Sequence, residues 1–554
     1  MSSLVPAENV RLLDGEAAAE WGLNPFALVE AAGRACAGVF VRSFPRFFVR
    51  SHTGEQAGGR PAAKAPAITV LAGSGNNAAD ALVMLRALLL KGRADPAAAL
   101  VLAGRLPADG EKTPLSEALR AIQKMHVSVR AWDGKETAAP LSCADIVIDG
   151  IAGTGLQGPL RGKALEMAEA VNRLREKSGA GSRPLVVSID LPSGNSDEWR
   201  SGMPMLTADV TLAIEPQKRC LYTPAVRSRA GRVVSAGGIF PRELIEKYQD
   251  AELLSWQDAA RRLPAIPADT YKYGRGLVEI RAGAPGTAGA ARLAAWGAQA
   301  AGAGLIRLVV DDSLYPVLAP AAAGIMVAPG GPSVPGGGRF QPDAVLLGPG
   351  WGRGPDRAAL LEQCLPIEER GIPLILDADA VYLAKDLTFH GNAILTPHAG
   401  EFAVYTGLDK EEILAGPAPV LRRFAREKNV HILFKSHVLY AAAPDGRLGI
   451  IDGMAPALAA GGSGDVLAGI CAALAGRLRA AAGKQREFDG YACTCAAAAL
   501  LMEAAGSPEI AGRFIDPAEL AGAAASIAGK AWLPAGSNAR NVIIDPADED
   551  DNII

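Results

Sequence analysis

The stretch AITVLAGSGNNAADALVMLRALLLKG, residues 67–92, decides the fold of the first half of the chain. A short apolar run at 67–73 passes through a turn rich in Gly and Asn and enters a pattern with helical spacing. A strand that leads directly into a helix is the repeating unit of a parallel sheet covered by helices on both faces. The stretch therefore predicts an α/β domain.

The same alternation extends outward along the chain in two series of apolar runs. The first series continues at 98–104, 145–150, 184–190 and 209–215, and the second occupies 276–283, 305–310, 344–350, 373–379, 392–398 and 431–437. A charged stretch with a helical pattern, 241–263, lies between them. We predict two α/β domains, one over residues 1–245 with a Rossmann-like doubly wound sheet and one over residues 255–545.

Composition narrows the classes of partner and compartment. The net charge of −3 gives no general attraction for nucleic acid. No apolar run approaches the roughly 18 residues of a membrane span, and the first 20 residues lack the pattern of a signal peptide. The seven cysteines are thinly spread, which favours a reducing compartment. We expect a cytoplasmic protein that binds neither nucleic acid nor membrane.

Three strand ends of the first half lead into unusual loops. These are SGNNAAD at 74–80, IAGTGLQGP at 151–159 and LPSGN at 191–195. Ligands of open α/β sheets bind beyond the carboxyl ends of the strands, and Gly-rich turns at helix starts offer backbone N–H groups to anions. The loops bring together oxygen-bearing side chains that suit a hard monovalent cation, namely Asn76, Asn77, Asp149, Asp190 and Ser193. Taken singly, each has a structural alternative as a helix cap or turn residue.

Five motifs of this half, in order, resemble the NAD(P)H-hydrate epimerase domain over about residues 10–240. They are NPFALVEAAG (24–33), GSGNNAAD (73–80), DIVIDGIAGTGLQGPL (145–160), SIDLPSG (188–194) and ADVTLAIEPQK (208–218). The resemblance implies interconversion of the R and S forms of hydrated nicotinamide cofactors, with Asp190 handling protons at the hydroxylated ring carbon. It implies a K⁺ ion held by Asn77, Asp149 and Ser193. It also implies a hydrate pocket lined by Asn76, Asn77, Ala78, Ala79, Asp80, Gly153, Thr154, Gly155, Leu156, Gln157, Gly158, Pro159 and Asp190.

One loop departs from that family, which usually reads GNNGGDG where this chain reads GNNAADA (75–81). Ala in a left-handed conformation costs about 1–2 kcal/mol. If Ala78 and Ala79 instead lie in the helix, Ala stabilises it by roughly 0.5–1 kcal/mol each over Gly. The retained Asp80 favours a weakened site over one that is lost. The same departure leaves an alternative interpretation, in which the first domain senses the cofactor without catalysing a reaction.

The second half has a Gly-rich turn that opens a helix, in MAPALAAGGSGDVLAGICAAL at 454–474. Backbone N–H groups of Gly461–Gly464 and the helix dipole would stabilise a transferring phosphoryl group, and Asp465 beside them could accept a hydroxyl proton. His398 and Lys435 follow two other strands. The structural alternatives are a helix cap for Asp465, a core histidine for His398 and a surface lysine for Lys435.

This half resembles the ADP/ATP-dependent NAD(P)H-hydrate dehydratases, which are relatives of ribokinase-type kinases, over about residues 270–545. The matching motifs are GPGWGRG (348–354), LDADAVYL (376–383), LTPHAGEF (395–402), LFKSHVLY (433–440) and the stretch 454–470. The resemblance implies a ribokinase-like fold that uses ADP or ATP with Mg²⁺. It places Gly350, His398 and Asp465 against the S hydrate, and Lys435, Ser436, His437, Val438, Leu439 and Gly464 against the nucleotide. The family usually has Gly where this chain has Ser436.

Together the two halves predict a fused epimerase and dehydratase that repairs hydrated NADH and NADPH (NADHX and NADPHX). Epimerisation would supply the S hydrate, which the second half would dehydrate with an adenine nucleotide. We also expect a homo-oligomer. The alternative is a ribokinase-like kinase for a small molecule, joined to a non-catalytic domain that senses the cofactor, because fold alone does not fix function.

Overall fold

A computed structural model describes residues 2–47, 65–108, 110–134, 139–177, 183–330, 341–482 and 488–533. The chain divides into two compact units. Unit 1 contains Met1–Leu253, Leu408–Val420 and Arg447–Met454, and unit 2 contains Leu254–Gly407, Leu421–Gly446 and Ala455–Ile554. The segments Leu408–Val420 and Arg447–Met454 thus belong to unit 1, although they lie within residues 255–545, which were predicted to form the second domain.

Unit 1 is built on a seven-stranded parallel sheet with the order β4-β3-β2-β5-β6-β7-β9. The chain moves outward from β2 through β3 to β4 and then crosses to β5 on the other side of β2. This reversal is the topological switch point at which doubly wound sheets bind ligands. The strands are β2 (Ile68–Ala72), β3 (Ala99–Ala103), β4 (Ser128–Ala131), β5 (Ile146–Gly150), β6 (Leu185–Ile189), β7 (Val210–Ile214) and β9 (Arg232–Ala236).

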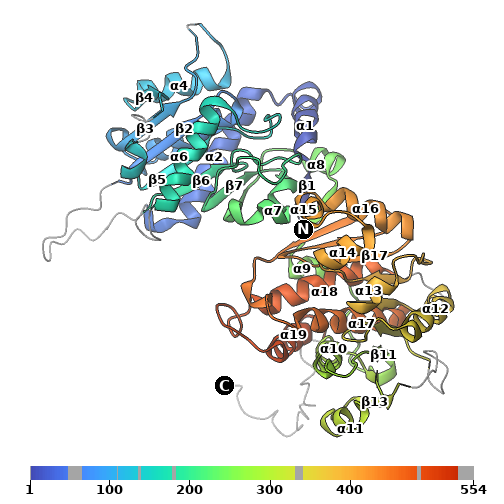
Figure 1. Ribbon diagram of the computed structural model, residues 1–554. Coiled ribbons are helices and arrows are strands. Elements are labelled where there is room, and N and C mark those ends of the chain that lie inside the picture. The colour runs from blue at the N-terminus through green and yellow to red at the C-terminus, as the bar shows by residue number, and fades with distance from the viewer. Residues whose placement is uncertain are drawn as a thin grey trace, which may run out of the picture. The chain divides into compact units, whose positions relative to one another are not determined.

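Helices cover both faces of this sheet, as Figure 1 shows in its blue and green part. One apolar layer joins alternate strand residues such as Val70 to α2 (Pro25–Ser43), α3 (Asn76–Leu90) and α4 (Pro114–Lys124). The other layer joins Leu71 and its neighbours to α6 (Gly162–Lys177). Burial on both faces explains why the central strands are continuously apolar.

The approach of α2 to α3 depends on a glycine. A Cβ atom at Gly33 would lie 2.5 Å from Cβ of Val83 and 2.7 Å from the carbonyl oxygen of Asp80. Asn24 caps α2 by accepting a hydrogen bond from the backbone N–H of Ala27 at 2.9 Å, a common helix start before Pro at the first position. The motif NPFALVEAAG therefore fixes where α2 begins and how closely it packs on α3.

Unit 1 contains a second set of strands, in the order β19-β10-β1-β8. Their bounds are β1 (Ser2–Val5), β8 (Gln217–Lys218), β10 (Ala251–Leu253) and β19 (Leu448–Asp452). The helices beside them are α1 (Ala7–Glu20), α7 (Pro224–Arg227), α8 (Arg242–Tyr248) and α15 (Lys410–Ala415). Arg227 of α7 donates two hydrogen bonds to the carboxylate of Asp452, at 2.8 and 2.7 Å, and this pair ties β19 into the unit.

The charged stretch 241–263 is not one helical segment, which corrects the interpretation of its pattern. After α8 the chain forms β10, which pairs antiparallel to β1 and parallel to β19. A new helix, α9 (Trp256–Ala260), then begins at Ser255, whose side chain forms a capping box with Asp258. Pairing with β1, a contact distant in sequence, overrides the local helical pattern.

Unit 2 contains a sheet in the order β13-β12-β11-β14-β15-β16-β17-β18. Its pairs are parallel except the hairpin of β17 and β18. The strands are β11 (Leu277–Arg281), β12 (Leu305–Val310), β13 (Met326–Pro329), β14 (Ala344–Leu347), β15 (Leu374–Leu376), β16 (Ala393–Leu395), β17 (His431–Phe434) and β18 (Val438–Ala442).

Small residues let two helices of unit 2 pack with their backbones touching. A Cβ at Gly297 would lie 2.1 Å from the carbonyl oxygen of Val466, and one at Gly469 would lie 1.9 Å from that of Ala294. This contact holds α17 (Ser463–Ala482) against α10 (Ala288–Ala300). Besides α9, the unit contains α11 (Tyr315–Leu318), α12 (Pro355–Glu369), α13 (Asp379–Leu383), α14 (Ala399–Thr406), α18 (Gly490–Ala505), α19 (Pro517–Trp532) and most of α16 (Pro417–Lys428).

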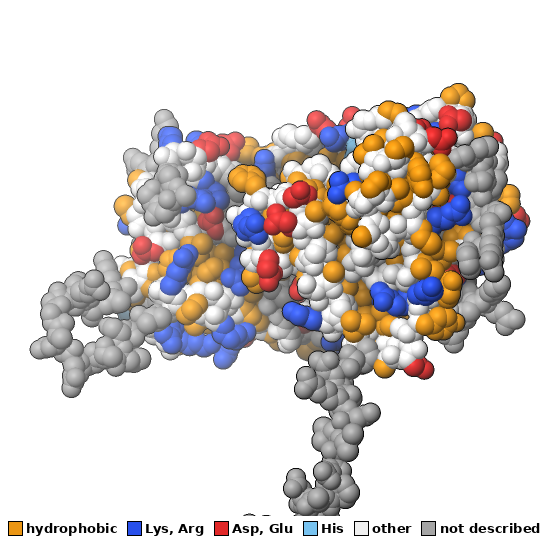
Figure 2. All heavy atoms as spheres, turned by 90° about the horizontal axis from the view of Figure 1, so that it is seen from below, with side chains coloured by type: hydrophobic (Ala, Val, Ile, Leu, Met, Phe, Trp, Pro, Cys, Tyr) orange, Lys and Arg blue, Asp and Glu red, His pale blue; other side chains and the backbone are white. Residues whose placement is uncertain are grey.

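The α/β class predicted for both halves is confirmed, and each predicted apolar run contains a strand. Within the described ranges, no helix is both long and apolar enough to cross a bilayer. On the face drawn in Figure 2, basic and acidic side chains lie among hydrophobic ones.

Candidate active sites

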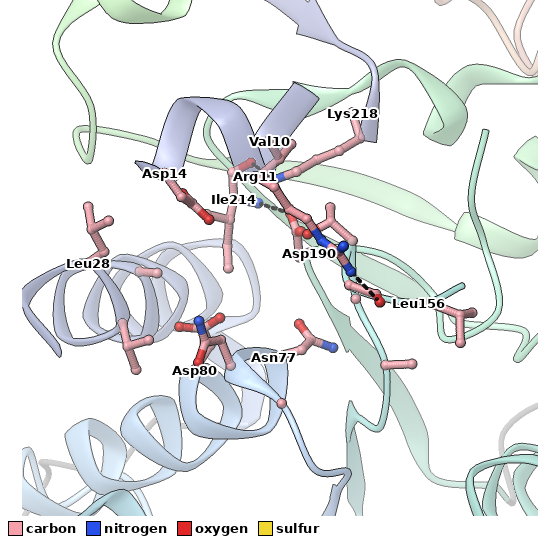
Figure 3. A pocket seen from close by; sticks show the side chains of 18 of the residues that line it. Val10, Arg11, Asp14, Leu28, Asn77, Asp80, Leu156, Asp190, Ile214 and Lys218 are labelled. Carbon is pink, nitrogen blue, oxygen red and sulfur yellow. Dashed lines mark hydrogen bonds and ion pairs between the residues drawn. The ribbon is translucent and has the colours of Figure 1, made fainter. Parts of the chain in front are cut away.

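The first site is a cavity of about 520 Å³ in unit 1, at the carboxyl ends of β2, β5 and β6, a size typical of small-molecule sites. Nine of the predicted pocket residues line it, namely Asn76, Asn77, Asp80, Gly153, Thr154, Gly155, Leu156, Gln157 and Asp190. Arg11 of α1 donates a hydrogen bond to the carbonyl of Gly155 at 2.9 Å. The first helix thereby holds one wall of the cavity (Figure 3).

Asp190 occupies a constrained position in this cavity. Its backbone is left-handed, with φ of 64°, a conformation that costs a non-glycine residue about 1–2 kcal/mol. Its Oδ1 accepts hydrogen bonds from Nζ of Lys218 at 2.6 Å and from the backbone N–H of Ile214 at 3.2 Å. Burial raises the pKa of Asp190, and Lys218 opposes that rise. The carboxyl group is therefore fixed in direction and paired with a buried ammonium group.

Two further carboxyl groups share the cavity with Asp190. Burial and, next, the charge of Asp190 hold the pKa of Asp80 well above its usual range. Burial also raises the pKa of Asp14 on α1, against the effect of Lys218. Figure 3 shows Asp14, Asp80 and Asp190 around one space. The sequence did not single out Asp14 or Lys218.

The three residues predicted to hold a cation differ in how free they are. Both amide atoms of Asn77 are buried and lack a hydrogen-bond partner among the described residues. The carboxylate of Asp149 accepts hydrogen bonds from Ser188 Oγ at 2.7 Å, Ser193 Oγ at 2.5 Å, Ser193 N at 2.9 Å and Ile151 N at 3.2 Å. These bonds occupy all of the roughly four lone-pair sites of a carboxylate.

The serine hydroxyl has a second acceptor within reach. Ser193 Oγ lies 3.2 Å from the carbonyl oxygen of Ala152, so its proton can turn away from Asp149. Asn77 lies at the same place, because a Cβ at Gly153 would meet its Cγ at 3.1 Å. Asn77 is thus the residue whose side chain is available to bind an ion. The main role of Asp149 is to hold the loops of Ile151 and Ser193 in place.

The structure selects the second of the two alternatives left open for the alanines of GNNAADA, in which they belong to the helix. Both lie within α3, whose N-cap is Gly75, and neither has a positive φ. Ala78 and Ala79 are fully buried in the apolar layer beneath the helix and do not line the cavity. The cost of a left-handed Ala therefore does not arise. Gly158 and Pro159 also fall outside the cavity lining.

The second site is a cluster of charged side chains in unit 2. Lys435, which follows β17, donates a hydrogen bond from Nζ to Oδ1 of Asp377 at 2.5 Å and lies 4.0 Å from Oε2 of Glu401. Burial lowers the pKa of Lys435, but Asp377, Glu401 and Asp465 outweigh it and raise the pKa overall. The lysine is therefore a fixed positive charge surrounded by carboxylates.

Asp465 lies in the first turn of α17 beside this lysine. A Cβ at Gly464 would lie only 3.5 Å from Lys435 Nζ, so the start of the helix is close to the ammonium group. Burial raises the pKa of Asp465 to about 7, Asp377 and Glu401 contribute to the rise, and Lys435 opposes it. A carboxylate with that pKa can accept a proton near neutral pH.

His398 is placed by helix α14. Its Nδ1 accepts hydrogen bonds from the backbone N–H groups of Gly400 at 2.9 Å and Glu401 at 3.1 Å, so it caps the helix that carries Glu401. Its side chain is 56% exposed, which rules out the core histidine considered from the sequence. Asp377 and Glu401 lie in motifs of the predicted site, LDADAVYL and LTPHAGEF, but were given no role there.

The remaining predicted residues lie in loops around the cluster. Gly350 has φ of 55°, and its carbonyl accepts a hydrogen bond from Thr287 Oγ1 at 2.7 Å. Ser436 closes the turn between β17 and β18, where its Oγ accepts from the backbone N–H of Val438 at 3.1 Å. His437 lies in the same turn, and Val438 and Leu439 begin β18. Of the predicted residues, the structure brings His398, Lys435, Gly464 and Asp465 together, because the backbone of His398 pairs with that of Lys435 in an isolated bridge and Gly464 and Asp465 lie beside the lysine side chain.

Comparison with known proteins assigns both halves. Residues 25–220 match the family model described as YjeF-related protein N-terminus, and residues 278–513 match the model described as NAD(P)H-hydrate dehydratase. A bifunctional NAD(P)H-hydrate repair enzyme of Moorella thermoacetica is 30% identical over 497 residues, which are 86% of this chain and 88% of that protein. Another of Gloeobacter violaceus is 32% identical over 493 residues, which are 85% and 88% of the two chains.

A solved structure is also similar to part of the chain. The ADP/ATP-dependent NAD(P)H-hydrate dehydratase of Bacillus subtilis, co-crystallised with ATP and Mg²⁺, has 24% identity and a TM-score of 0.45. The match covers 51% of this chain and 99% of that one.

Proposed function

Because the chain belongs to the family of bifunctional NAD(P)H-hydrate repair enzymes, we propose that its two sites carry out that family's two reactions. The enzyme epimerises hydrated NADH and NADPH and dehydrates the S hydrate to NAD(P)H. Epimerisation takes place in the cavity of unit 1, and dehydration takes place at the cluster of Lys435 and Asp465 in unit 2. The observation that carries this assignment is the position of Asp465 in the first turn of α17, beside Lys435 and its partners Asp377 and Glu401.

The second site is suited to activating a hydroxyl group for phosphorylation. Asp465 accepts the proton of the hydrate's hydroxyl as its oxygen attacks the terminal phosphoryl group of the nucleotide. The N–H groups of Gly461, Gly462 and Gly464, at the start of α17, stabilise the phosphoryl oxygens, and Lys435 balances their charge, while the N–H of Ser463 donates to the carbonyl of Ala460 at 3.3 Å. Phosphate then leaves as the lone pair of the ring nitrogen forms a carbon–nitrogen double bond. Loss of a proton from the adjacent ring carbon returns that electron pair to nitrogen and restores the carbon–carbon double bond of the nicotinamide ring.

The nucleotide is ADP or ATP, with Mg²⁺ to neutralise its phosphates. Among the residues that the structure describes, no three His, Cys, Asp or Glu side chains are grouped to hold a metal ion by themselves. This fits Mg²⁺, which usually takes one or two carboxylates and completes its shell with phosphates and water. Asp377 and Glu401 are the carboxylates that would serve here.

K⁺ is proposed for the first site because the donors suit it. Asn77 has a buried amide oxygen with no partner among the described residues. Ser193 Oγ accepts one hydrogen bond, from the backbone N–H of Ala152 at 2.9 Å, and keeps a second lone pair for the ion when its proton turns to the carbonyl of Ala152. Asp149 would contribute charge and keep the loops of Ile151 and Ser193 in place. When bound, K⁺ supplies positive charge where the hydrate's phosphates approach the start of α3.

Paired variants of the full chain test the assignment of the two reactions. Asp190→Asn should stop the loss of R-NADHX measured without nucleotide, yet leave dehydration of purified S-NADHX intact. Asp465→Asn should do the reverse. Each variant is the folding control of the other. If either variant loses both activities while its melting temperature is unchanged, the reactions do not divide between the units in this way.

The predictions of a cytoplasmic location and of a homo-oligomer are retained in this proposal. The seven thinly spread cysteines are the feature that favours a reducing compartment. Light scattering of the purified chain measures the oligomeric state, and a mass equal to one chain would remove the oligomer from the proposal.

A further inference from the structure

The cavity of unit 1 holds more acid–base groups than a single-base epimerase requires. Asp80 extends from the second turn of α3 and Asp190 follows the end of β6, and both line the same cavity. Figure 3 shows the two side chains directed into one space, with Lys218 beside Asp190. Both carboxyl groups are buried, at 8% and 7% exposure, so each is placed to act on a bound ring rather than on bulk solvent.

The surroundings of the two carboxyl groups differ. Asp190 accepts hydrogen bonds from Lys218 Nζ at 2.6 Å and from the backbone N–H of Ile214 at 3.2 Å, and both contacts favour its ionised form. Asp80 has no ion-pair partner among the described residues, and burial together with the charge of Asp190 favours its protonated form. Two carboxyl groups whose environments separate them in this way are suited to opposite roles.

We infer that Asp80 and Asp190 act as an acid and a base on the hydroxylated ring carbon, and that Lys218 is a positioning residue that keeps Asp190 ionised. The inference rests on the proposed epimerase function and extends it from one proton-handling residue to a pair.

The chemistry follows from the structure of the hydrate, whose hydroxyl-bearing carbon is bonded to the ring nitrogen. Asp80 donates its proton to the hydroxyl oxygen, the carbon–oxygen bond breaks, and water leaves as the nitrogen lone pair forms a carbon–nitrogen double bond. A second water molecule then attacks the opposite face of that carbon, the double bond returns its electrons to nitrogen, and Asp190 accepts the proton. In the reverse direction Asp190 is the acid and Asp80 the base. Proton exchange with solvent resets the pair.

Other titratable groups face this pair and contribute to its pH dependence. They come from several elements and are Asp14 of α1, Cys36 of α2, Lys218 of β8 and Cys220, which follows β8. Burial and the nearby carboxylates raise the pKa of Cys36 and of Cys220 well above the usual thiol range, so both remain neutral. Arg11 of α1 and Glu215, which follows β7, also line the cavity, so the charge balance at the site rests on Lys218, Arg11, Glu215 and the three aspartates.

The first test is Asp80→Asn in the full chain, with purified R-NADHX and no nucleotide. Asn has the shape of the protonated acid and cannot donate its proton as an acid, so the fold should be kept. We expect epimerisation to slow by about 10²–10⁴-fold, the usual loss on removing a general acid, while dehydration of S-NADHX by the same protein is unchanged.

The second test follows the oxygen atom. Wild-type chain in water enriched in ¹⁸O should place one ¹⁸O in each inverted molecule, because the entering water attacks the face opposite to the leaving one. Mass spectrometry of the S hydrate formed at early times measures this, with an enzyme-free sample as the control. Inverted product that retains its original oxygen would overturn the water-exchange step.

The third test separates positioning from structure. Lys218→Met removes the charge that lowers the pKa of Asp190, so the acid limb of the epimerisation profile should move to higher pH, and Lys218→Arg should restore it. If Lys218→Met does not fold, the profile of Lys218→Arg alone decides, since it must match that of the wild type. A wild-type chain that does not accelerate epimerisation contradicts the proposed function, whereas a fully active Asp80→Asn contradicts only this inference.

Discussion

Replacing Asp465 by Asn should stabilise unit 2 at alkaline pH even though it abolishes dehydration. Burial and the neighbouring carboxylates raise the pKa of this group from 3.8 to about 7 in the folded chain. A group whose folded pKa is raised contributes stability that is complete below its unfolded pKa and is lost as the pH rises through its folded pKa. At 1.36 kcal/mol per pKa unit, the total loss is about 4 kcal/mol.

Most of this loss falls within a range that is convenient to measure. By the linkage relation, about 1.5 kcal/mol is lost below pH 5 and about 2.5 kcal/mol more between pH 5 and pH 8. Asn does not titrate. The free energy of unfolding of Asp465→Asn, relative to that of the wild type, should therefore rise by about 2–3 kcal/mol from pH 5 to pH 8. The cause is the removal of a buried negative charge near Asp377 and Glu401.

Hydrogen exchange followed by mass spectrometry is the suitable assay, because peptides from α17 and α18 report on unit 2 alone. The difference in their opening free energy between Asp465→Asn and wild type is compared at pH 5 and pH 8. Asp516→Asn, at the exposed cap of α19, serves as a control for the substitution itself. A difference that stays the same at both pH values would refute the buried, proton-holding environment assigned to Asp465.

Three further predictions follow from the same contacts. The dehydration rate should rise with pH through about 7 and then level off, since Asp465 acts in its ionised form. Lys435→Met should move the midpoint of that rise to higher pH, because Lys435 lowers the pKa of Asp465. A midpoint that does not move in a series of rates measured against pH would contradict Asp465 as the base. Ala78→Gly with Ala79→Gly should lower the free energy of unfolding by about 2–3 kcal/mol without faster epimerisation, because both methyl groups are buried in a helix; an epimerase several times faster would restore the idea of a weakened site. Asn77→Ala should abolish the rise in melting temperature that K⁺ gives relative to Na⁺. Stability in Na⁺ should be unchanged or higher, because the amide of Asn77 has no hydrogen-bond partner among the described residues. A K⁺ effect that survives in the variant would place the ion elsewhere.

The sequence predicted the sheets well because their strands are buried on both faces. Runs such as ITVLA in β2 are continuously apolar, and this signal does not depend on distant contacts. The strands that were missed are short or partly exposed, such as β4 with the sequence SVRA, or are defined by pairing, such as β10 within a charged stretch. Pairing between residues 2–4 and 251–253 leaves no local pattern.

Prediction of the sites followed the same division. Residues at strand ends, such as Asp190 and Lys435, were found because parallel sheets gather those ends at one edge, and Asp465 was found because a Gly-rich turn opens its helix. Asp14 was missed because it reaches the cavity from α1, an element whose sequence carries no sign of a site. The sequence left the conformation of Ala78 open, because a helix that begins at Asn76 looks, in sequence, like a loop that continues to Asp80.

The central claim, two reactions in series on one chain, is tested most directly by a mixture of R- and S-NADHX incubated with the wild-type protein, Mg²⁺, K⁺ and ADP or ATP. NADH absorbance, free phosphate and both epimers are followed together. The account predicts that both epimers disappear, that NADH is recovered in full, and that one phosphate is released per NADH formed. A stable phosphorylated product without NADH would contradict it and indicate a kinase, and an R epimer that persists at the uncatalysed rate would show that unit 1 does not epimerise.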